Sequence, residues 1–260
     1  MNKIKNRLVN FLFLGLSCVP ISAFALPQYQ LCSKQQKVQL IKQFSLKQIQ
    51  SSEEYPSYSS CVVLNAQQKL IAISNPIHTE SDYADYDLNL YLIDTQKQQI
   101  LKKYKESQST ASDAAHFENM QFDTNPFSTS NAKQLIGLRF QHGHLGSDSF
   151  TIKELKLFEL DTQNNMRLVL DSFRTDFEGE TRPHFKCQDG LYTNSKVLLI
   201  PQQSTTNGLN DFKIKETVFR QEPNENSCKV KKINKSKTHY MRFDGKKYDF
   251  KHLNFLDYGI

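Results

Sequence analysis

The segment His142-Gly143-His144, followed by Asp148, is the densest group of residues able to carry chemistry. Histidines separated by one residue share a face of an extended segment, so both imidazoles can reach one metal ion. The sequence fixes no further ligand. His142, His144 and Asp148 are therefore weak metal candidates beside the simpler interpretation of a polar loop, and no metal or other cofactor is expected. The same loop, at 141–150, is a candidate for contact with a partner, as is the loop at 75–87.

Asp176, Glu178 and Glu180 are the chain's most regular carboxylates. Their alternate spacing places them on one face of a strand, which is compatible with calcium binding or a glycosidase-like pair. A solvated strand end is the simpler interpretation. The sequence contains no G-x-S-x-G nucleophile turn and no glycine-rich phosphate loop. No catalytic residue is assigned, and the chain is interpreted as a binding protein rather than an enzyme.

The C-terminal stretch combines basic and aromatic residues. Between Lys229 and Lys251, nine lysines and arginines stand against two aspartates. Such a stretch faces an acidic partner or an anionic surface, or it keeps edge strands soluble. The segment 243–248 reads as a hairpin around Asp-Gly. Its rings either seal the open edge of the sheet or dock a partner. The residues proposed for docking are Arg242, Phe243, Lys246, Lys247 and Tyr248.

A repeated strand pattern must position these groups. Residues 88–96 and 155–163 both read L-x-L-[Y/F]-x-[L/I]-D-T-Q. Side chains alternate between the faces of a strand, and these strands are apolar on both faces, so we expect packing on each side. The aspartate begins a turn by bonding backbone two residues on. Each copy is predicted to be a hairpin with a loop of about five or six residues.

The similarity extends upstream, where residues 69–73 correspond to 134–138, and a weaker third copy spans 196–231 with a loop at 204–210. We therefore predict an all-β fold of repeated antiparallel meander units of about 65 residues, arranged either like a propeller or as a stacked sandwich. The units are approximately 58–110, 116–178 and 182–235, with a closing hairpin at 238–260. The spacing of apolar residues in 34–54 partly fits a helix and partly a strand, and 105–115 is expected to be an exposed connection.

Residues 1–25 are typical of a secretory signal. A basic start precedes an apolar run, and Ala23-Phe24-Ala25 supplies a cleavage pattern. The run is too short and too interrupted for a membrane span. We therefore expect a single periplasmic domain at 26–260, without a transmembrane segment and without nucleic acid as a partner. Secretion, or a lipid anchor through Cys18, is the alternative.

The mature chain retains four cysteines, an even number that suggests two disulfides after export. Four cysteines permit three connectivities. Proximity in sequence and the unit boundaries favour Cys32–Cys61, which ties the N-terminal segment to the first unit. They also favour Cys187–Cys228, which clamps the third unit.

The layout resembles exported β-repeat proteins of Gram-negative bacteria, some of which are similar to immunity proteins against periplasmic toxins. The signal, the two L-x-L hairpins and the Cys187…Thr206-Asn207-Gly208…Cys228 unit carry the likeness. The resemblance implies a periplasmic protein that binds a protein partner, as an immunity or inhibitor protein neutralising a cell-envelope toxin or hydrolase. A cell-wall hydrolase with a His/carboxylate site and an envelope structural protein are the alternatives.

Overall fold

The computed structural model describes residues 29–49, 54–128, 133–144, 146, 148–180, 190–224 and 227–249. The signal expected at 1–25 lies outside them. The described residues are mostly β, which confirms the predicted class. They form α1 (Lys34–Gln43) and twelve strands: β1 (Gln30–Leu31), β2 (Tyr58–Val63), β3 (Gln68–Thr79), β4 (Ala84–Asp94), β5 (Gln99–Ser112), β6 (His116–Phe122), β7 (Lys133–His144), β8 (Ser149–Asp161), β9 (Met166–Glu180), β10 (Tyr192–Thr206), β11 (Leu209–Pro223) and β12 (Val230–Met241).

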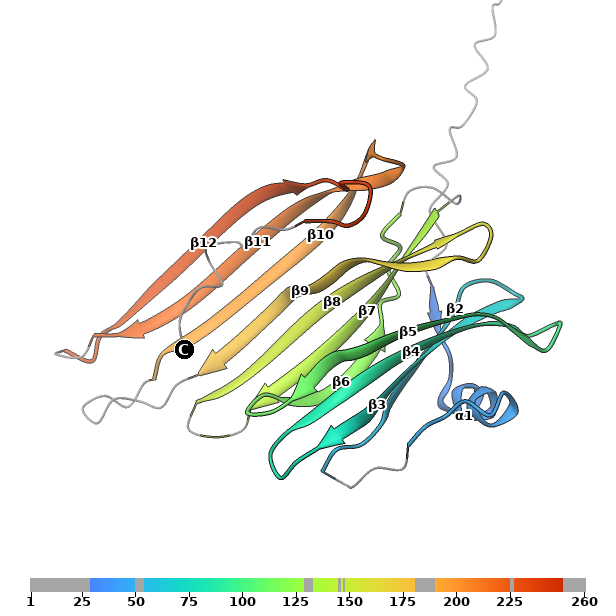
Figure 1. Ribbon diagram of the computed structural model, residues 1–260. Coiled ribbons are helices and arrows are strands. Elements are labelled where there is room, and N and C mark those ends of the chain that lie inside the picture. Colours follow the sequence, from blue (N-terminus) through green and yellow to red (C-terminus); the bar gives the residue numbers. More distant parts are fainter. Residues whose placement is uncertain are drawn as a thin grey trace, which may run out of the picture.

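The strands form two open antiparallel sheets (Figure 1). Five strands, β1 to β5, make the first sheet, and seven strands, β12 to β6, make the second. Each strand pairs with its neighbours in sequence, so both sheets are meanders. An inter-sheet core joins them, because one buried cluster contains residues of both, among them Leu70, Leu88, Leu90, Ile136 and Phe158. The described strands are thus two stacked sheets without a radial arrangement of blades.

The two motif copies occupy equivalent places. Residues 88–93 lie in β4, at the centre of β3-β4-β5, and residues 155–160 lie in β8, at the centre of β7-β8-β9. The registers also correspond, since Ile71 pairs with Tyr91 and Ile136 pairs with Phe158. The first meander has its own sheet, whereas the second and third share the other. Descent of the three from one repeated design stays a prediction.

The two motif strands turn opposite sets of alternating side chains toward the inter-sheet core. Leu88 and Leu90 of the first copy point into the inter-sheet core. Phe158 of the second copy lies in that same core, whereas its Leu157 lies in another buried cluster. Tyr91 packs in a smaller cluster that includes Leu40 of α1. The prediction that both faces of each motif strand are covered is therefore confirmed.

The aspartate of each motif begins a turn, as predicted. Each turn has four residues between its strands, fewer than the five or six that were expected. Asp94 Oδ1 accepts from the Gln96 and Lys97 amides at 3.0 and 2.8 Å. Asp161 Oδ1 accepts from the Gln163 and Asn165 amides at 2.9 and 2.8 Å. These bonds supply the backbone partners that a tight turn needs.

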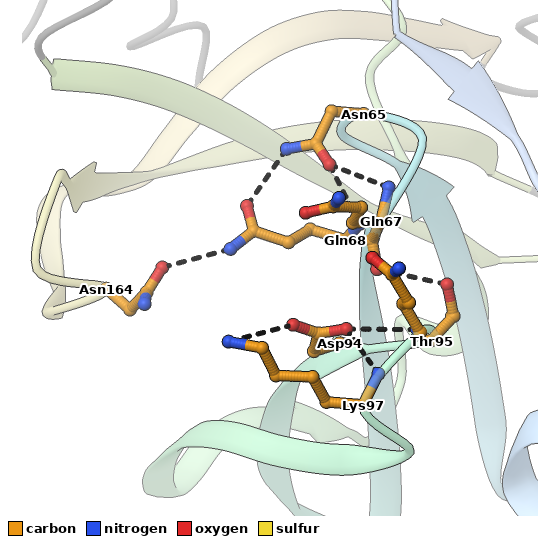
Figure 2. A network of polar contacts seen from close by, with 8 residues as sticks. Asn65, Gln67, Gln68, Asp94, Thr95, Lys97 and Asn164 are labelled. Carbon is orange, nitrogen blue, oxygen red and sulfur yellow. Dashed lines mark hydrogen bonds and ion pairs between the residues drawn. The ribbon is translucent and has the colours of Figure 1, made fainter.

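The turns of the two sheets meet in the polar network of Figure 2. Gln68 Nε2 donates to Asn164 Oδ1 at 3.2 Å and so links the first sheet to the β8–β9 turn. Asn65 Oδ1 accepts from the Gln67 and Gln68 amides at 2.9 Å each. The Thr95 amide and hydroxyl both donate to the Gln67 carbonyl. The network fixes the relative position of the turns at this end of the molecule.

The prediction of long loops from the sequence is wrong. β3 and β4 occupy most of 75–87, β7 and β8 occupy most of 141–150, and β5 continues through 105–112. The expected loop at 204–210 is a two-residue turn, with Asn207 and Gly208 at φ 51° and 83°. Asn-Gly suits such a turn because both positions need positive φ. Polar residues on the exposed face of a long hairpin read locally as loop, although their backbone is paired.

The N-terminal segment is fixed by a helix and a disulfide. Within the undecided stretch 34–54, Lys34–Gln43 form α1, which begins at a capping box: Ser33 Oγ accepts from the Gln36 amide, and Gln36 Oε1 accepts from the Ser33 amide. The predicted Cys32–Cys61 disulfide is confirmed and ties this segment to β2. The Cys187–Cys228 pairing stays a prediction, because Cys187 lies outside the described residues.

Candidate binding surface

His142 lies on β7 and not in the loop predicted for it. Its side chain is buried, its ring stacks on Phe117 at 5.4 Å between centroids, and Nε2 lies 3.2 Å from the Thr110 hydroxyl. Burial lowers the pKa of His142, because the imidazolium loses its hydration. The residue therefore acts as a neutral side chain of the core and is not presented to a partner, which corrects its assignment as a contact residue.

His144 shares the face of His142 but is engaged separately. Its Nδ1 lies 2.7 Å from the Ala114 carbonyl, and its ring stacks on Phe150 at 5.5 Å. Asp148 lies just before β8. Within the described ranges, no three His, Cys, Asp or Glu residues are grouped so that they could hold a metal ion. The described structure thus adds nothing to the metal hypothesis, and His144 stays a partner candidate.

The burial of His142 predicts a pH dependence of stability. Its folded pKa lies below the ordinary value of 6.5, so between those two values the unfolded chain binds more protons. The free energy of unfolding should therefore fall as pH decreases below about 6.5. Urea denaturation at pH 7.5 and 5.5 should show a smaller fall in His142→Gln than in the wild type. His116→Gln provides the matched control, because it replaces a histidine that is exposed and lies outside the core. An equal fall in the free energy of unfolding between pH 7.5 and 5.5 in all three proteins would contradict the assignment of this dependence to His142.

Asp176, Glu178 and Glu180 alternate along β9, as predicted from their spacing. Tyr192 donates its hydroxyl to Glu178 Oε1 at 2.9 Å, and Arg139 Nη1 lies 4.0 Å from Asp176 Oδ2. Glu178 and Glu180 are exposed. They border a surface hollow of about 250 Å³ whose lining also includes Glu118, His144 and Phe150. The arrangement is that of a solvated strand end with partners from neighbouring strands.

The predicted hairpin around Asp244-Gly245 is present. Phe243 and Tyr248 form an antiparallel bridge, and Asp244 Oδ1 accepts from the Lys246 and Lys247 amides at 2.6 and 2.7 Å. Gly245 adopts φ 104°, which suits glycine. The hairpin lies against β9 and β11, since the Tyr248 amide donates to the Val169 carbonyl and its hydroxyl donates to the Asn210 carbonyl.

The rings of the hairpin are part of the core. Phe243 and Tyr248 are 1% and 3% exposed and belong to the buried cluster that contains Phe212. They are therefore not available to a partner, which corrects their assignment as docking residues. The rings pack in this cluster beside β9 and β11, whereas β12 is the edge strand, so sealing of an open edge stays a prediction. Arg242, Lys246 and Lys247 are exposed and stay candidates for partner contact.

A surface that the sequence reasoning missed lies on β10, β11 and β12. The register places Leu198, Lys215 and Thr238 in one row across these strands, and Ile200, Lys213 and Tyr240 in the next. We call this surface the lysine–apolar face. Its members are Lys196, Leu198, Ile200, Lys213, Lys215, Thr217, Ser236, Thr238 and Tyr240. It contains three lysines and no carboxylate.

The apolar side chains of the lysine–apolar face are open to solvent. Leu198 is 58% exposed, Ile200 39% and Tyr240 66%. The intervening residues of the same strands, such as Val197, Ile214 and Met241, are buried in the cluster that contains Phe243. β10 and β11 are therefore covered on one face only, whereas most of β12 is exposed on both faces. Figure 1 shows β10, β11 and β12 on the side of the second sheet away from β2–β5, which explains why the first sheet does not cover them.

Comparison with protein-family models, with curated proteins and with solved structures gives no match. Among the described residues, none of the helical structure has the length and apolar composition of a membrane span.

Proposed function

We propose that the chain is an exported binding protein that contacts an acidic protein partner through the lysine–apolar face. In this role it acts in the periplasm as an immunity or inhibitor protein against a cell-envelope toxin or hydrolase. One observation carries the proposal: Leu198, Ile200 and Tyr240 are exposed on a sheet face beside Lys196, Lys213 and Lys215, the charged residues among its nine members.

The composition of this face suits a protein interface. Large apolar side chains gathered on a surface contribute free energy when a partner removes them from water, and tyrosine is frequent among the residues that dominate binding. Lysines in the same patch contribute association rate and selectivity for a partner of opposite charge. None of the nine members is a carboxylate, and Asp176 of β9 lies opposite Lys196 at the margin of the face, so an acidic partner would meet the positive charge of Lys213 and Lys215 at its centre.

A protein partner fits the arrangement better than an anionic lipid surface. Lys213 and Lys215 lie on the central strand β11, between the aliphatic residues of β10 and Tyr240 of β12. Membrane insertion favours an apolar face with the basic side chains along its margin. Here insertion of the apolar residues would bury the central lysines as well. Carboxylates of a protein partner can instead meet the two lysines individually.

The Cys32–Cys61 disulfide supports export, because such bonds persist in oxidising compartments. We extend the proposal to a second disulfide, Cys187–Cys228, and to descent of the three meanders from one repeated unit. Peptide mass mapping of the purified protein without reduction tests the second disulfide directly.

The test compares two double variants of the mature protein. Leu198→Asp/Tyr240→Asp places carboxylates on the lysine–apolar face, whereas Val38→Asp/Ile77→Asp alters two large apolar residues that are 55% and 46% exposed elsewhere. Each immobilised protein is exposed to envelope extract, and captured proteins are crosslinked and identified by mass spectrometry. We expect the first variant to lose at least about 100-fold in affinity for the captured acidic partner, and the control less than about threefold.

The crosslinks must map to β10–β12, and salt must weaken capture, since a partner of opposite charge is screened by ions. Equal capture of the partner by both double variants would contradict the proposal. Binding to vesicles of anionic lipid in the absence of any captured protein would replace the protein partner with a membrane surface.

A further inference from the structure

The carboxylates at the end of β9 lie on the same side of the second sheet as the lysine–apolar face. Lys196, a member of that face, pairs with Asp176 of β9, and residues directly opposite each other in a ladder share a face. Glu178 and Glu180 follow Asp176 at alternate positions and therefore lie on that side as well. The hydroxyl of Tyr192 on β10 donates to Glu178 Oε1 at 2.9 Å, in agreement with this placement. The exposed side of the sheet thus continues from the lysine–apolar face to these carboxylates.

These carboxylates form an acidic end, which we define as Glu118, Glu178 and Glu180. Glu118 of β6 lines the same hollow of about 250 Å³ as the other two. All three are exposed, and within the described ranges none of them forms an ion pair. Lys232 shares the row of Glu180 but lies three strands away, roughly 14 Å across the sheet. The negative charge of the acidic end is therefore not compensated by a cation of the described chain.

The centre of the lysine–apolar face is uncompensated in the opposite sense. Neither Lys213 nor Lys215 forms an ion pair with a described residue. The row between the two ends differs, because Asp176 lies opposite both Lys153 and Lys196. The exposed side of the sheet therefore has a positive, apolar end and an acidic end, with a row of mixed charge between them.

We propose that a second copy of this chain covers this side of the sheet, with the lysine–apolar face of each copy over the acidic end of the other. A twofold axis parallel to the sheet and perpendicular to the line between the two ends gives this arrangement. It brings Lys213 and Lys215 of one copy to Glu178 and Glu180 of the other, and the contact recurs with the copies exchanged, as an isologous interface requires. The inference does not depend on the proposed function, because it states what covers the face when no partner is bound. An acidic partner would compete with the second copy.

The dimensions of this side suit such an interface. Lys213 lies opposite Ile200 of β10 and Glu180 lies opposite Tyr192, so the side extends from 192 to 200, or roughly 27 Å at about 3.4 Å per residue. From β7 to β12 it measures roughly 24 Å across, at about 4.8 Å per strand. The resulting area of about 650 Å² per copy is somewhat below the roughly 800 Å² per partner of a standard-size interface. We therefore expect a reversible dimer that forms at micromolar concentration.

The two ends also complement each other in shape. Leu198 is 58% exposed and Tyr240 66%, whereas the acidic end borders a hollow with Phe150 and Tyr192 in its lining. An apolar side chain of the other copy can enter this hollow while the neighbouring lysines reach its carboxylates. Burial of apolar area then supplies affinity, and the charges fix the orientation.

Other occupants compensate this side less completely. A second copy with matching ends superposed would bring lysines against lysines and carboxylates against carboxylates, and like charges suppress such complexes. A purely acidic molecule would meet repulsion at the acidic end. A second copy in the proposed orientation compensates both ends with the chain's own residues.

Sedimentation velocity of the mature protein across the micromolar range tests the inference. The wild type should dimerise, and more weakly as salt rises, because ions screen the charge pairs. Lys213→Glu/Lys215→Glu and Glu178→Lys/Glu180→Lys each leave one sign of charge at both ends, so each should lose at least about tenfold in dimer affinity. An equimolar mixture of the two variants should form a heterodimer at least as tightly as the wild type, because opposite charges then meet at both contacts.

Lys34→Glu/Lys47→Glu provides the matched control, because it reverses two exposed lysines of the N-terminal segment. It should dimerise within about threefold of the wild type, as expected of surface substitutions away from an interface. Circular dichroism establishes that each variant is folded.

A wild type that stays monomeric, or a dimer that both reversals leave intact, would overturn the inference. A mixture that stays monomeric although both variants are folded would do the same. Failure of the inference is distinct from failure of the proposed function. A monomer that captures an acidic partner through the lysine–apolar face removes the dimer alone. A dimer with the expected response to both reversals, and no partner captured from extract, removes the proposed function alone.

Discussion

Phe158→Ala is expected to lower the free energy of unfolding by roughly 3–5 kcal/mol. Phe158 is fully buried in the inter-sheet core, and its ring lies 5.4 Å from that of Tyr104 on the opposite sheet. Removing the ring leaves a cavity between two sheets whose paired backbones resist collapse. Urea denaturation followed by circular dichroism measures the loss as a lower midpoint at an unchanged slope.

Tyr240 provides the matched control, because it is also an aromatic residue on a strand of the second sheet but is 66% exposed. Tyr240→Ala should change the free energy of unfolding by no more than about 0.5 kcal/mol. A comparable loss in both variants would mean that Phe158 does not hold the sheets together. The control also separates stability from binding, since the same residue belongs to the lysine–apolar face.

Local patterns predicted the parts of the fold that neighbouring residues determine. The alternation in residues 88–93 and 155–160 identified two strands buried on both faces, because burial of each face leaves a direct mark on residue type. The Asp-Thr-Gln and Asp-Gly segments predicted turns for the same reason, since short-range hydrogen bonds from Asp94, Asp161 and Asp244 form them. The even cysteine count and short separation pointed to Cys32–Cys61.

Whether a second layer covers a given strand is decided by distant residues, and sequence reasoning failed there. Residues 197–200 are apolar on both faces, as are residues 155–160. Only one face of 197–200 is covered, however. Lys213 and Lys215, two positions apart on the next strand, were the available signal for an exposed face. The prediction of loops at 75–87 and 141–150 failed for the converse reason, because backbone pairing in long hairpins is independent of side-chain polarity.

Conversely, Phe243 and Tyr248 show how composition alone misassigns a surface. Aromatic and basic residues alternate in the closing hairpin, which is also the composition of many interfaces. The turn at Asp244-Gly245 folds both rings inward and leaves Lys246 and Lys247 exposed. The basic half of the prediction thus lies on the surface and the aromatic half does not.

The second large effect on unfolding free energy is expected from substitution of a charged side chain that is buried between the sheets. Lys156 on β8 is 3% exposed, and its Nζ lies 2.6 Å from Glu106 Oε1 and 2.7 Å from Asp171 Oδ1. Glu106 belongs to β5, so this ion pair joins the two sheets. Asp171 is 56% exposed and keeps contact with water, whereas Glu106 Oε2 is buried without a hydrogen-bond partner. Lys156 is consequently the group that compensates the Glu106 charge.

Lys156→Met is expected to cost roughly 3–5 kcal/mol of unfolding free energy, because it leaves the Glu106 carboxylate buried without a cation. Lys156→Met/Glu106→Met removes both charges at similar volume and should return to within about 1–2 kcal/mol of the wild type, since well-packed apolar residues often replace a buried ion pair at little cost. Urea denaturation of the wild type, both single variants and the double variant gives the coupling energy. If the double variant were as unstable as the sum of the singles, the two side chains would act independently, and the stacking of the sheets would depend on apolar contacts such as those of Phe158 alone.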